Sequence, residues 1–205
     1  MALQGYNVIK NYEMLNKPVL LAVARGFCVE NKVFEEKIVP QFDKSLVCFF
    51  TGNRPHKLPW GDDESDERCE AIKKKIEEAI LALYGEGKRL FVCGMAKGGD
   101  LYFAEAVLAL KERGYALELE CAVPCPEQTK GWRESERARY DRVLEKADYI
   151  TLVSPHYSKY CMHKRNRYMA DKSSAVVALS YGSSGGTEAT VRYAESKKLQ
   201  IIRIN

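Results

Sequence analysis

Residues 89–114 read RLFVCGMAKGGDLYFAEAVLALKERG, and this stretch decides the fold. It opens with a compact apolar run, continues through a glycine-rich turn at 94–100, and then places apolar residues at helical spacing up to Gly114. Glycine commonly ends a helix because it adopts the left-handed conformation there without strain. A short apolar run, a glycine-rich turn and an amphipathic helix together form the repeating unit of parallel α/β proteins.

Outward from this stretch, apolar runs and helical patterns alternate throughout residues 45–205. Most runs are continuous, which is typical of strands that helices cover on both faces. In the run 117–123, Glu118 and Glu120 alternate with apolar residues, so we expect a wetter side near an edge of the sheet. We predict an α/β fold, a Rossmann-like three-layer sandwich with a mainly parallel sheet. The expected strands are residues 46–50, 89–93, 117–123, 149–153, 175–179 and 200–204, and the expected helices include residues 69–83, 104–108, 134–146, 159–172 and 187–197.

The first 44 residues do not follow this alternation. Their apolar stretches, 18–24 and 33–39, are sufficient for order, so we expect an N-terminal appendage, residues 1–44, packed on the core domain of residues 45–205. One interpretation is a helical arm that covers an edge strand. The other is a dimerisation arm, which would make the protein a homodimer.

Composition narrows the class of protein. A chain of 205 residues that is 46% hydrophobic and 29% charged buries a sizeable core, which excludes disorder as its main state. It begins without a charged leader and has no apolar run near the ~18 residues that cross a bilayer, so we expect a cytoplasmic protein without membrane contact. Its seven cysteines form no Cys-x-x-Cys pair, and we expect reduced, buried thiols.

Three loops rich in glycine, hydroxyl or basic residues each follow a predicted strand, at 51–56, 94–100 and 182–187. The carboxyl ends of parallel strands share one edge of a sheet, where ligands bind in open α/β folds. Glycine lets the backbone approach a ligand, and the free amides at a helix N-terminus suit phosphate. Any one of these loops is equally explained as a tight turn, but three at one edge favour a phosphate site.

Basic and aromatic residues near these loops complete the candidate site. Arg54, Lys97 and Arg165 are placed to make charge-assisted contacts, with a solvated surface cation as the alternative for each. Trp132 either stacks on a base or belongs to the core of its helix. The predicted ligand-binding residues are Thr51, Gly52, Arg54, Gly94, Lys97, Gly98, Gly99, Asp100, Trp132, Arg165, Gly182, Ser183, Ser184, Gly185, Gly186 and Thr187.

Several common mechanisms do not fit the sequence. It has no Gly-x-Gly-x-x-Gly motif, and residues 94–100 do not match the phosphate loop of ATPases. Gly182-x-Ser184-x-Gly186 matches a nucleophile elbow, but every histidine precedes it, whereas a serine hydrolase of that fold needs one after it. The cysteines and histidines fit no standard zinc spacing. We therefore predict no metal and no required cofactor.

Five motifs occur in order at or near the strand ends: Thr51-Gly-x-Arg-Pro, Gly94-x-x-x-Gly98-Gly-Asp100, Gln128-x-x-x-Trp132 with Tyr140, Arg165-Asn-Arg-x-Met169-x-Asp171, and Gly182-x-x-Gly-Gly-Thr187. From about residue 45 to the C-terminus, the chain thereby resembles the YpsA-like bacterial family of the SMF/DprA/LOG (SLOG) superfamily of Rossmann-like proteins. The resemblance implies a pocket for a nucleotide or nucleotide derivative of the ADP-ribose, NAD or AMP type, in a sensing or regulatory role.

The LOG branch of that superfamily gives an enzymatic alternative. Its members cleave the N-glycosidic bond of nucleoside monophosphates with an Arg in an Arg-x-x-x-Met string and a Glu three residues after the Thr of a Gly-x-Gly-Thr loop. Arg165 and Met169 match the first motif, whereas Thr190 stands where the Glu is expected. Glu188 lies two positions earlier, on a different side of the helix. A hydrolase with Asp100 and Arg165 as catalytic residues is therefore the alternative to binding alone.

The DprA branch binds single-stranded DNA and gives a second alternative. Residues 159–172 contain five Lys/Arg and one Asp, which equals the whole net charge of +4, and Tyr157, Tyr160 and Tyr168 lie in or beside them. A charge of +4 and a pI of 8.6 are low for a dedicated nucleic-acid binder. We expect Tyr160 and Tyr168 to pack against the protein, and a small-molecule nucleotide as the partner.

Overall fold

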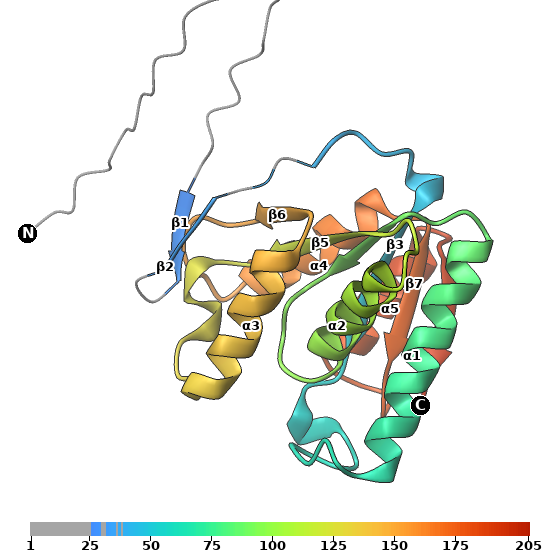
Figure 1. The fold of residues 1–205 in the computed structure, drawn as a ribbon, viewed down its shortest axis with the longest axis horizontal. Helices are drawn as coiled ribbons and strands as arrows, with labels where there is room; N and C mark the ends of the chain where they lie inside the picture. Colours follow the sequence, from blue (N-terminus) through green and yellow to red (C-terminus); the bar gives the residue numbers. More distant parts are fainter. Residues whose placement is uncertain (1–25, 30–31, 36, 38) are drawn as a thin grey trace, which may run out of the picture.

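The computed structural model describes residues 26–29, 32–35, 37 and 39–205. Its core is a six-stranded parallel sheet in the order β6-β5-β4-β3-β7-β8 (Figure 1). The strands are β3 Val47–Gly52, β4 Leu90–Cys93, β5 Glu118–Val123, β6 Tyr149–Leu152, β7 Ala175–Leu179 and β8 Gln200–Ile204. The helices are α1 Glu67–Gly85, α2 Gly99–Glu112, α3 Glu134–Lys146, α4 Cys161–Lys172 and α5 Gly186–Ser196, with short 3-10 helices at Lys44–Leu46, Pro55–Lys57 and Pro126–Thr129. The predicted Rossmann-like α/β fold is confirmed.

Strand side chains alternate between two apolar layers. Phe50 and Phe91 belong to the layer under α1, α2 and α3, whereas Phe49 and Val92 belong to the layer under α4 and α5. Figure 1 shows these two groups of helices on opposite sides of the sheet. Because both faces are covered, the central strands are apolar on both sides, which explains their continuous runs. None of the described helices has both the length and the apolar character needed to cross a bilayer.

The direction of the chain across the sheet reverses at β3. From β3 the chain adds β4, β5 and β6 on one side, and it then returns to add β7 and β8 on the other. Such a reversal leaves a crevice at the carboxyl ends of the two strands that flank it, here β3 and β7. The loops that follow β3, β4 and β7 therefore lie next to one another.

Strand β5 corrects the expectation of a wetter side. It lies second from the edge, and Glu120 is fully buried on the face that α4 covers. The Glu120 carboxylate accepts hydrogen bonds from Thr151 Oγ1 (2.9 Å) and Tyr168 Oη (2.6 Å), and it forms an ion pair with Lys172. A buried carboxylate needs such partners. The alternation in this strand thus marks a buried polar network instead of a solvated face.

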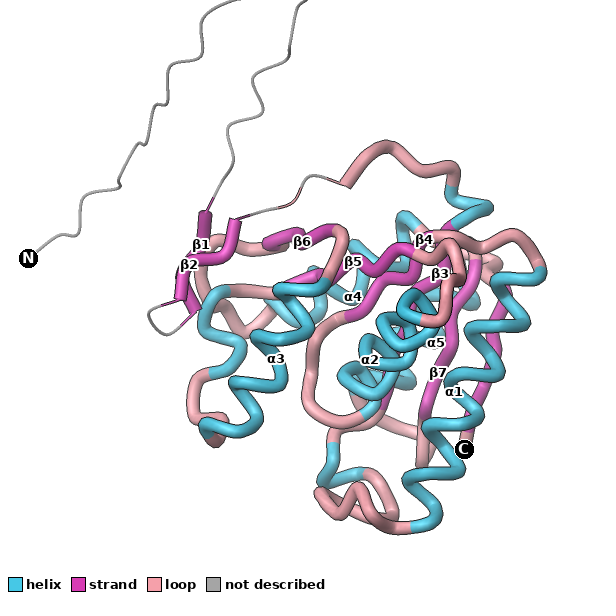
Figure 2. The backbone as a smooth tube through the Cα atoms, viewed as in Figure 1, coloured by secondary structure: helices cyan, strands magenta, loops and turns pink. Residues whose placement is uncertain are grey.

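The described part of the N-terminal appendage is an antiparallel hairpin, not a helix. It consists of β1, Gly26–Val29, and β2, Lys32–Glu35. Beyond the hairpin, Lys37 forms an antiparallel bridge with Ile150 of β6. The described part of the appendage therefore lies beside the outer edge of β6 (Figure 2), a common protection for an edge strand. The apolar stretch 18–24 lies outside the described residues, and the dimerisation arm stays a prediction.

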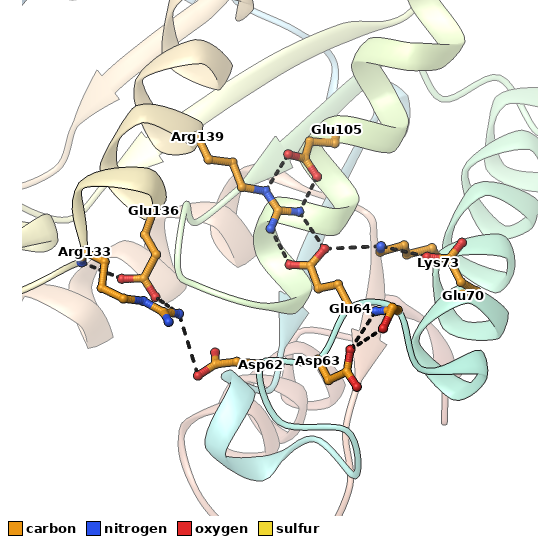
Figure 3. A network of polar contacts seen from close by, with 10 residues as sticks. Asp62, Asp63, Glu64, Glu70, Lys73, Glu105, Arg133, Glu136 and Arg139 are labelled. Carbon is orange, nitrogen blue, oxygen red and sulfur yellow. Dashed lines mark hydrogen bonds and ion pairs between the residues drawn. The ribbon is translucent and has the colours of Figure 1, made fainter.

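A network of charged side chains joins α1, α2 and α3 on their shared face (Figure 3). Arg139 of α3 forms ion pairs with Glu105 of α2 (2.6 Å) and with Glu64, which precedes α1. Lys73 of α1 pairs with Glu64 as well (3.2 Å). Both cations also lie over the Tyr102 ring, at 5.5 Å for Lys73 and 5.6 Å for Arg139. These contacts fix the three helices relative to one another.

Candidate functional site

Asn53, the middle residue of the first motif, joins the three glycine-rich loops. Its amide nitrogen Nδ2 donates to Thr187 Oγ1 (3.3 Å), and its Oδ1 accepts from the backbone N–H of Tyr181 (2.6 Å). Its own carbonyl oxygen accepts from the N–H of Gly99 at the start of α2 (3.3 Å). The side chain is only 4% exposed, so these bonds are shielded from water. One buried residue therefore sets the positions of the loops after β3, β4 and β7.

A cavity of about 290 Å³ opens between these loops and α4. Of the predicted ligand-binding residues it is lined by Thr51, Gly52, Arg54, Asp100, Arg165, Gly186 and Thr187. The remaining lining residues are Asn53, His56, Lys57, Ala96, Met162, His163, Asn166 and Met169. The cavity thus lies at the crevice between β3 and β7, and α4 supplies its far wall.

Arg165 forms part of the cavity wall with its guanidinium almost fully buried. It donates hydrogen bonds to the carbonyl oxygen of Gly94 and to Asn166 Oδ1 (2.8 Å). A Cβ at position 94 would collide with the guanidinium, so glycine is required there to admit the arginine. Burial lowers the pKa of Arg165, while the nearby Asp100 opposes this shift. Gly94 therefore serves the arginine and does not itself line the cavity.

Asp100 is the only carboxylate among the described residues that line this cavity. It lies in the first turn of α2 and is 4% exposed. Its Oδ2 accepts a hydrogen bond from the backbone N–H of Ala96 (3.2 Å). Burial raises the pKa of Asp100 to about 6, although the charge of Arg165 and the Ala96 N–H both act to lower it. The carboxyl group therefore changes charge close to neutral pH.

The opposite side of the cavity is suited to an anion. Helix α5 begins at Gly186, and its N-cap residue, Gly185, provides no side chain to satisfy the first amides. The ammonium of Lys57 lies beside Gly185: a Cβ added to Gly185 would be only 2.5 Å from Lys57 Nζ. Arg54 lines the same cavity, and in the described part of the chain neither cation has a carboxylate partner. Two unpaired cations and the positive end of a helix dipole thus face one space.

Lys97 and Trp132 line a second cavity, of about 390 Å³, together with Gln128 and Lys130. The Lys97 ammonium forms an ion pair with Glu136 (2.5 Å) and lies 5.0 Å from the centre of the Trp132 ring. The predicted role of Lys97 as a cation for the ligand therefore has a competitor in the carboxylate of Glu136. The charge of Lys97 is largely neutralised within the protein.

Gly98 and Gly99 shape the loops and stay outside the first cavity, whereas Gly52 lines it. Gly98 has a φ of +82° as the N-cap of α2, and a Cβ there would lie 3.0 Å from the Asn53 carbonyl oxygen. A Cβ at Gly52 would lie 3.2 Å from the Cα of Gly99, so these two glycines let β3 and α2 approach closely. Residues 182–185 form an exposed loop that does not line the cavity.

Gln128 explains the third motif. Its Nε2 donates to the carbonyl oxygens of Met95 (2.8 Å) and Gly94 (3.1 Å), and its Oε1 accepts from Tyr140 Oη (3.2 Å). Tyr140 in turn packs edge to face on Trp132, with ring centres 5.6 Å apart. The motif holds the loop after β4 in place. Nothing in the sequence around Gln128 predicted that its side chain bonds to the loop after β4.

The glutamate that the hydrolase motif requires is absent from the cavity. At its position, Thr190 Oγ1 donates to the carbonyl oxygen of Gly186 (2.8 Å) and accepts from Asn166 Nδ2 (2.7 Å). Glu188 forms an ion pair with Arg203 of β8 (3.0 Å), on another side of α5. Glu188 therefore does not replace the missing carboxylate.

The basic segment at the start of α4 differs from expectation at one tyrosine. Tyr168 packs inside, as predicted, but Tyr160 is 57% exposed and Tyr157 is 66% exposed. Tyr160 is the N-cap residue of α4, and Lys159 lies over its ring at 4.9 Å. Among the described residues, no group of three His, Cys, Asp or Glu side chains is arranged to hold a metal ion.

The strand order and the site at the β3–β7 crevice define a Rossmann-like protein of the SLOG class. The chain belongs to the YpsA family: the family model, described as the YspA SLOG family, matches residues 48–204. It is 33% identical over 136 residues to the UPF0398 protein BH1768 of Halalkalibacterium halodurans, covering 65% of this chain and 71% of that protein. It is 30% identical to the UPF0398 protein YpsA of Bacillus subtilis, covering 65% and 74%.

Two solved structures share the fold at low sequence identity. DNA processing protein A (DprA) of Streptococcus pneumoniae superposes with a TM-score of 0.54 at 17% identity, over 77% of this chain and 50% of that one. DprA of Helicobacter pylori gives a TM-score of 0.52 at 17% identity, over 80% and 66%. This chain therefore spans half of the pneumococcal DprA chain. At this identity the likeness shows the fold alone.

The buried Asp100 predicts a specific pH dependence of stability. Its pKa is about 6 in the folded protein against an ordinary value of 3.8, so the folded state binds more protons than the unfolded state between these values. Below the ordinary pKa of 3.8, Asp100 makes its whole contribution to the free energy of unfolding. As the pH rises through about 6 this contribution is lost, which lowers the free energy of unfolding by on the order of 3 kcal/mol. Denaturant unfolding from about pH 4 to about pH 8 should show this loss in the wild type and not in Asp100→Asn. Parallel stability curves for the two proteins would contradict the burial of this charge.

Proposed function

We propose that the protein binds a nucleotide or nucleotide derivative of the ADP-ribose, NAD or AMP type and acts as a sensor or regulator. The observation that carries this proposal is that Arg54 and Lys57, which have no ion-pair partner among the described residues, line one cavity together with the N-terminus of α5. Phosphate is the ligand group that such a combination of helix amides and basic side chains favours.

The rest of the cavity fits the other parts of a nucleotide. Met162 and Met169 of α4 offer polarizable apolar surface on which a base or ribose can pack. Asp100, across the cavity from α5, offers its carboxyl group to a ribose hydroxyl. A neutral Asp100 would also repel the phosphates less, because its charge is lost as the pH falls through about 6.

Binding without hydrolysis follows from the position of Thr190. Cleavage of an N-glycosidic bond needs a carboxylate that stabilises the ribosyl cation or activates water. Thr190 has no charge, and its hydroxyl is engaged by Gly186 and Asn166. Among the described lining residues, only Asp100 could substitute for it.

Nucleotide binding predicts a rise in melting temperature. A ligand that binds only the native state adds ~2.7 kcal/mol of stability at a hundred times its dissociation constant, so AMP or ADP-ribose should raise Tm in a concentration-dependent way. Lys57→Glu should abolish the rise, because a carboxylate beside Gly185 repels phosphate. Lys74→Glu, the same charge change on the exposed side of α1, should leave it intact. No shift of the wild type across a nucleotide panel would exclude this class of ligand.

The absence of the glutamate predicts no base release. Incubation with nucleoside 5′-monophosphates should yield no free base above background by chromatography, since a positioned acid or base contributes ~10²- to 10⁴-fold in rate. Asp100→Asn is the control. Release by the wild type that disappears in this variant would overturn the binding-only proposal in favour of the hydrolase.

Single-stranded DNA binding is the second candidate, and the exposed tyrosines favour it. Tyr157 and Tyr160 are exposed, and Lys159 lies over the Tyr160 ring. Lys164 and Arg167 are exposed on the helix that follows, so aromatic and positively charged side chains occur on one segment of the surface. The H. pylori DprA, which shares the fold, is described by its single-stranded DNA binding mode. This surface adjoins the first cavity, because Met162 and His163 of the same helix line it.

The tyrosine surface predicts a stacking contribution to DNA affinity. If this surface binds oligothymidylate, replacing both Tyr157 and Tyr160 by Ala should weaken binding in fluorescence anisotropy, at ~1–3 kcal/mol per stacked base. Leu46→Ala, an exposed apolar residue just before β3, should change nothing. Equal affinity of the wild type and the double variant would remove this candidate.

A further inference from the structure

We infer that the cavity between α4 and α5 is a second anion site, which binds a phosphate monoester and is separate from the nucleotide site proposed above. The cavity measures about 330 Å³, which lies within the ~300–1,000 Å³ range of small-molecule sites. It shares His163 and Asn166 with the first cavity, but neither Arg54 nor Lys57 lines it. Its other lining residues are Arg167, Ala189, Thr190, Arg192 and Tyr193.

Two arginines, one from each helix, give this cavity its positive charge. Arg167 of α4 and Arg192 of α5 line it, and both side chains are exposed. Within the described part of the chain, neither arginine forms an ion pair and no carboxylate lines the cavity. Two positive charges with no negative counterpart therefore line one space, before any charge on His163 is counted.

The Tyr193 ring holds the guanidinium of Arg167. The Arg167 Cζ atom lies 5.2 Å from the ring centre, and Tyr193 Oη donates a hydrogen bond to Asp171 Oδ1 (2.8 Å). Asp171, one turn after Arg167 in α4, also pairs with Lys197 (3.2 Å), whose ammonium lies 5.2 Å from the same ring centre. The charge of Asp171 is therefore met by Lys197. A guanidinium that contacts a ring keeps N–H donors free, so Arg167 stays available to an oxyanion.

The acidic side chains next to Arg192 on α5 are bound to another cation as well. Glu188 and Glu195 both pair with Arg203 of β8, at 3.0 Å and 3.3 Å. The pKa of Glu188 is lowered by a hydrogen bond with Ser180 and by Arg203, and the charge of Arg192 contributes less. Arg203 thus serves the two glutamates, which leaves the guanidinium of Arg192 for a ligand.

A hydrogen bond between the two helices fixes the spacing of the arginines. Asn166 Nδ2 of α4 donates to Thr190 Oγ1 of α5 (2.7 Å), and Thr190 is only 4% exposed. This bond is therefore shielded from water. The backbone segments that carry Arg167 and Arg192 are held at a set distance, although both side chains end at the surface.

This arrangement suits a doubly charged oxyanion. A phosphate monoester carries about −1.5 to −2 charge at neutral pH, which two guanidinium groups balance. Arginine binds phosphate through two parallel N–H···O bonds. A phosphate diester has a single negative charge and fewer free oxygens, so the site should favour the monoester. A free small molecule and a phosphorylated protein side chain both present this group.

The experiment measures the binding of methyl phosphate by ligand-observed phosphorus NMR. The parent protein is the full chain with Lys57→Glu, because a carboxylate beside Gly185 keeps phosphate out of the first cavity. We expect saturable binding that weakens at least about fivefold when Arg167→Gln and Arg192→Gln are added, since both charge-assisted contacts are lost. Dimethyl phosphate should bind at least about fivefold more weakly than methyl phosphate. A phosphoserine peptide that binds more tightly than methyl phosphate would assign the group to a protein partner, and equal or weaker binding would assign it to a small molecule.

The controls separate this site from general surface charge and from misfolding. Lys74→Gln with Lys198→Gln removes two exposed positive charges that line neither cavity, and it should leave the affinity unchanged. Arg167→Lys keeps the charge without the planar fork and should weaken binding less than Arg167→Gln. Each variant should melt at the temperature of the parent, because the replaced side chains are exposed.

Three results would overturn the second site. They are equal affinities of the parent and the double arginine variant, the same loss in the lysine control, and binding of dimethyl phosphate as tight as that of methyl phosphate, which would favour a nucleic-acid backbone. A wild type whose Tm does not rise with any nucleotide would overturn the proposed function alone and leave this site standing.

Discussion

The arrangement of the site depends on one buried amide, that of Asn53. Its hydrogen bonds reach the loop before α5, and its carbonyl oxygen reaches the start of α2, so a single residue after β3 fixes both helix N-termini. A buried polar side chain is costly unless its bonds are made, and here both ends of the amide bond to the segment between β7 and α5, while the backbone carbonyl bonds to the start of α2. The strand order brings the three loops close to one another. Asn53 then sets the relative positions of Thr187, Gly99 and the cations on its own loop.

A second constraint is the burial of Arg165 beside Asp100. Burying a guanidinium is tolerated when carbonyl and carboxylate groups surround it, and Gly94 provides the carbonyl because it lacks the side chain that would block the approach. Gln128 then holds the same carbonyl from the other side. The loop after β4 is therefore fixed between two polar side chains from distant parts of the chain, and it keeps Asp100 in a setting where its pKa lies near 6.

The elements of the fold are predictable from sequence because each strand and helix has a local apolar pattern. Contacts between distant residues are not. Glu120 looks solvated in its alternating strand, and its burial is made tolerable by Thr151, Tyr168 and Lys172, which lie 31, 48 and 52 residues away. Lys97 looks like a free cation, and its partner Glu136 is 39 residues away. The glycines that we predicted as lining residues lie in the loops around the cavity, but several of them set the conformation of a loop instead of lining the cavity. Lys57 belongs to none of the motifs, yet it lines the cavity.

The replacement of a carboxylate by Thr190 has two consequences that act in the same direction. A glutamate at this position, one turn into α5, would add negative charge close to the helix N-terminus and to the space that we assign to phosphate. It would assist cleavage and would also repel an anionic ligand at rest. Thr190 removes both effects, and its hydroxyl bonds to Gly186 and Asn166 help to fix the α5 N-terminus against α4. A cavity whose described lining residues offer cations and helix amides, with Asp100 as their single carboxylate, fits the proposed binding role better than the hydrolase.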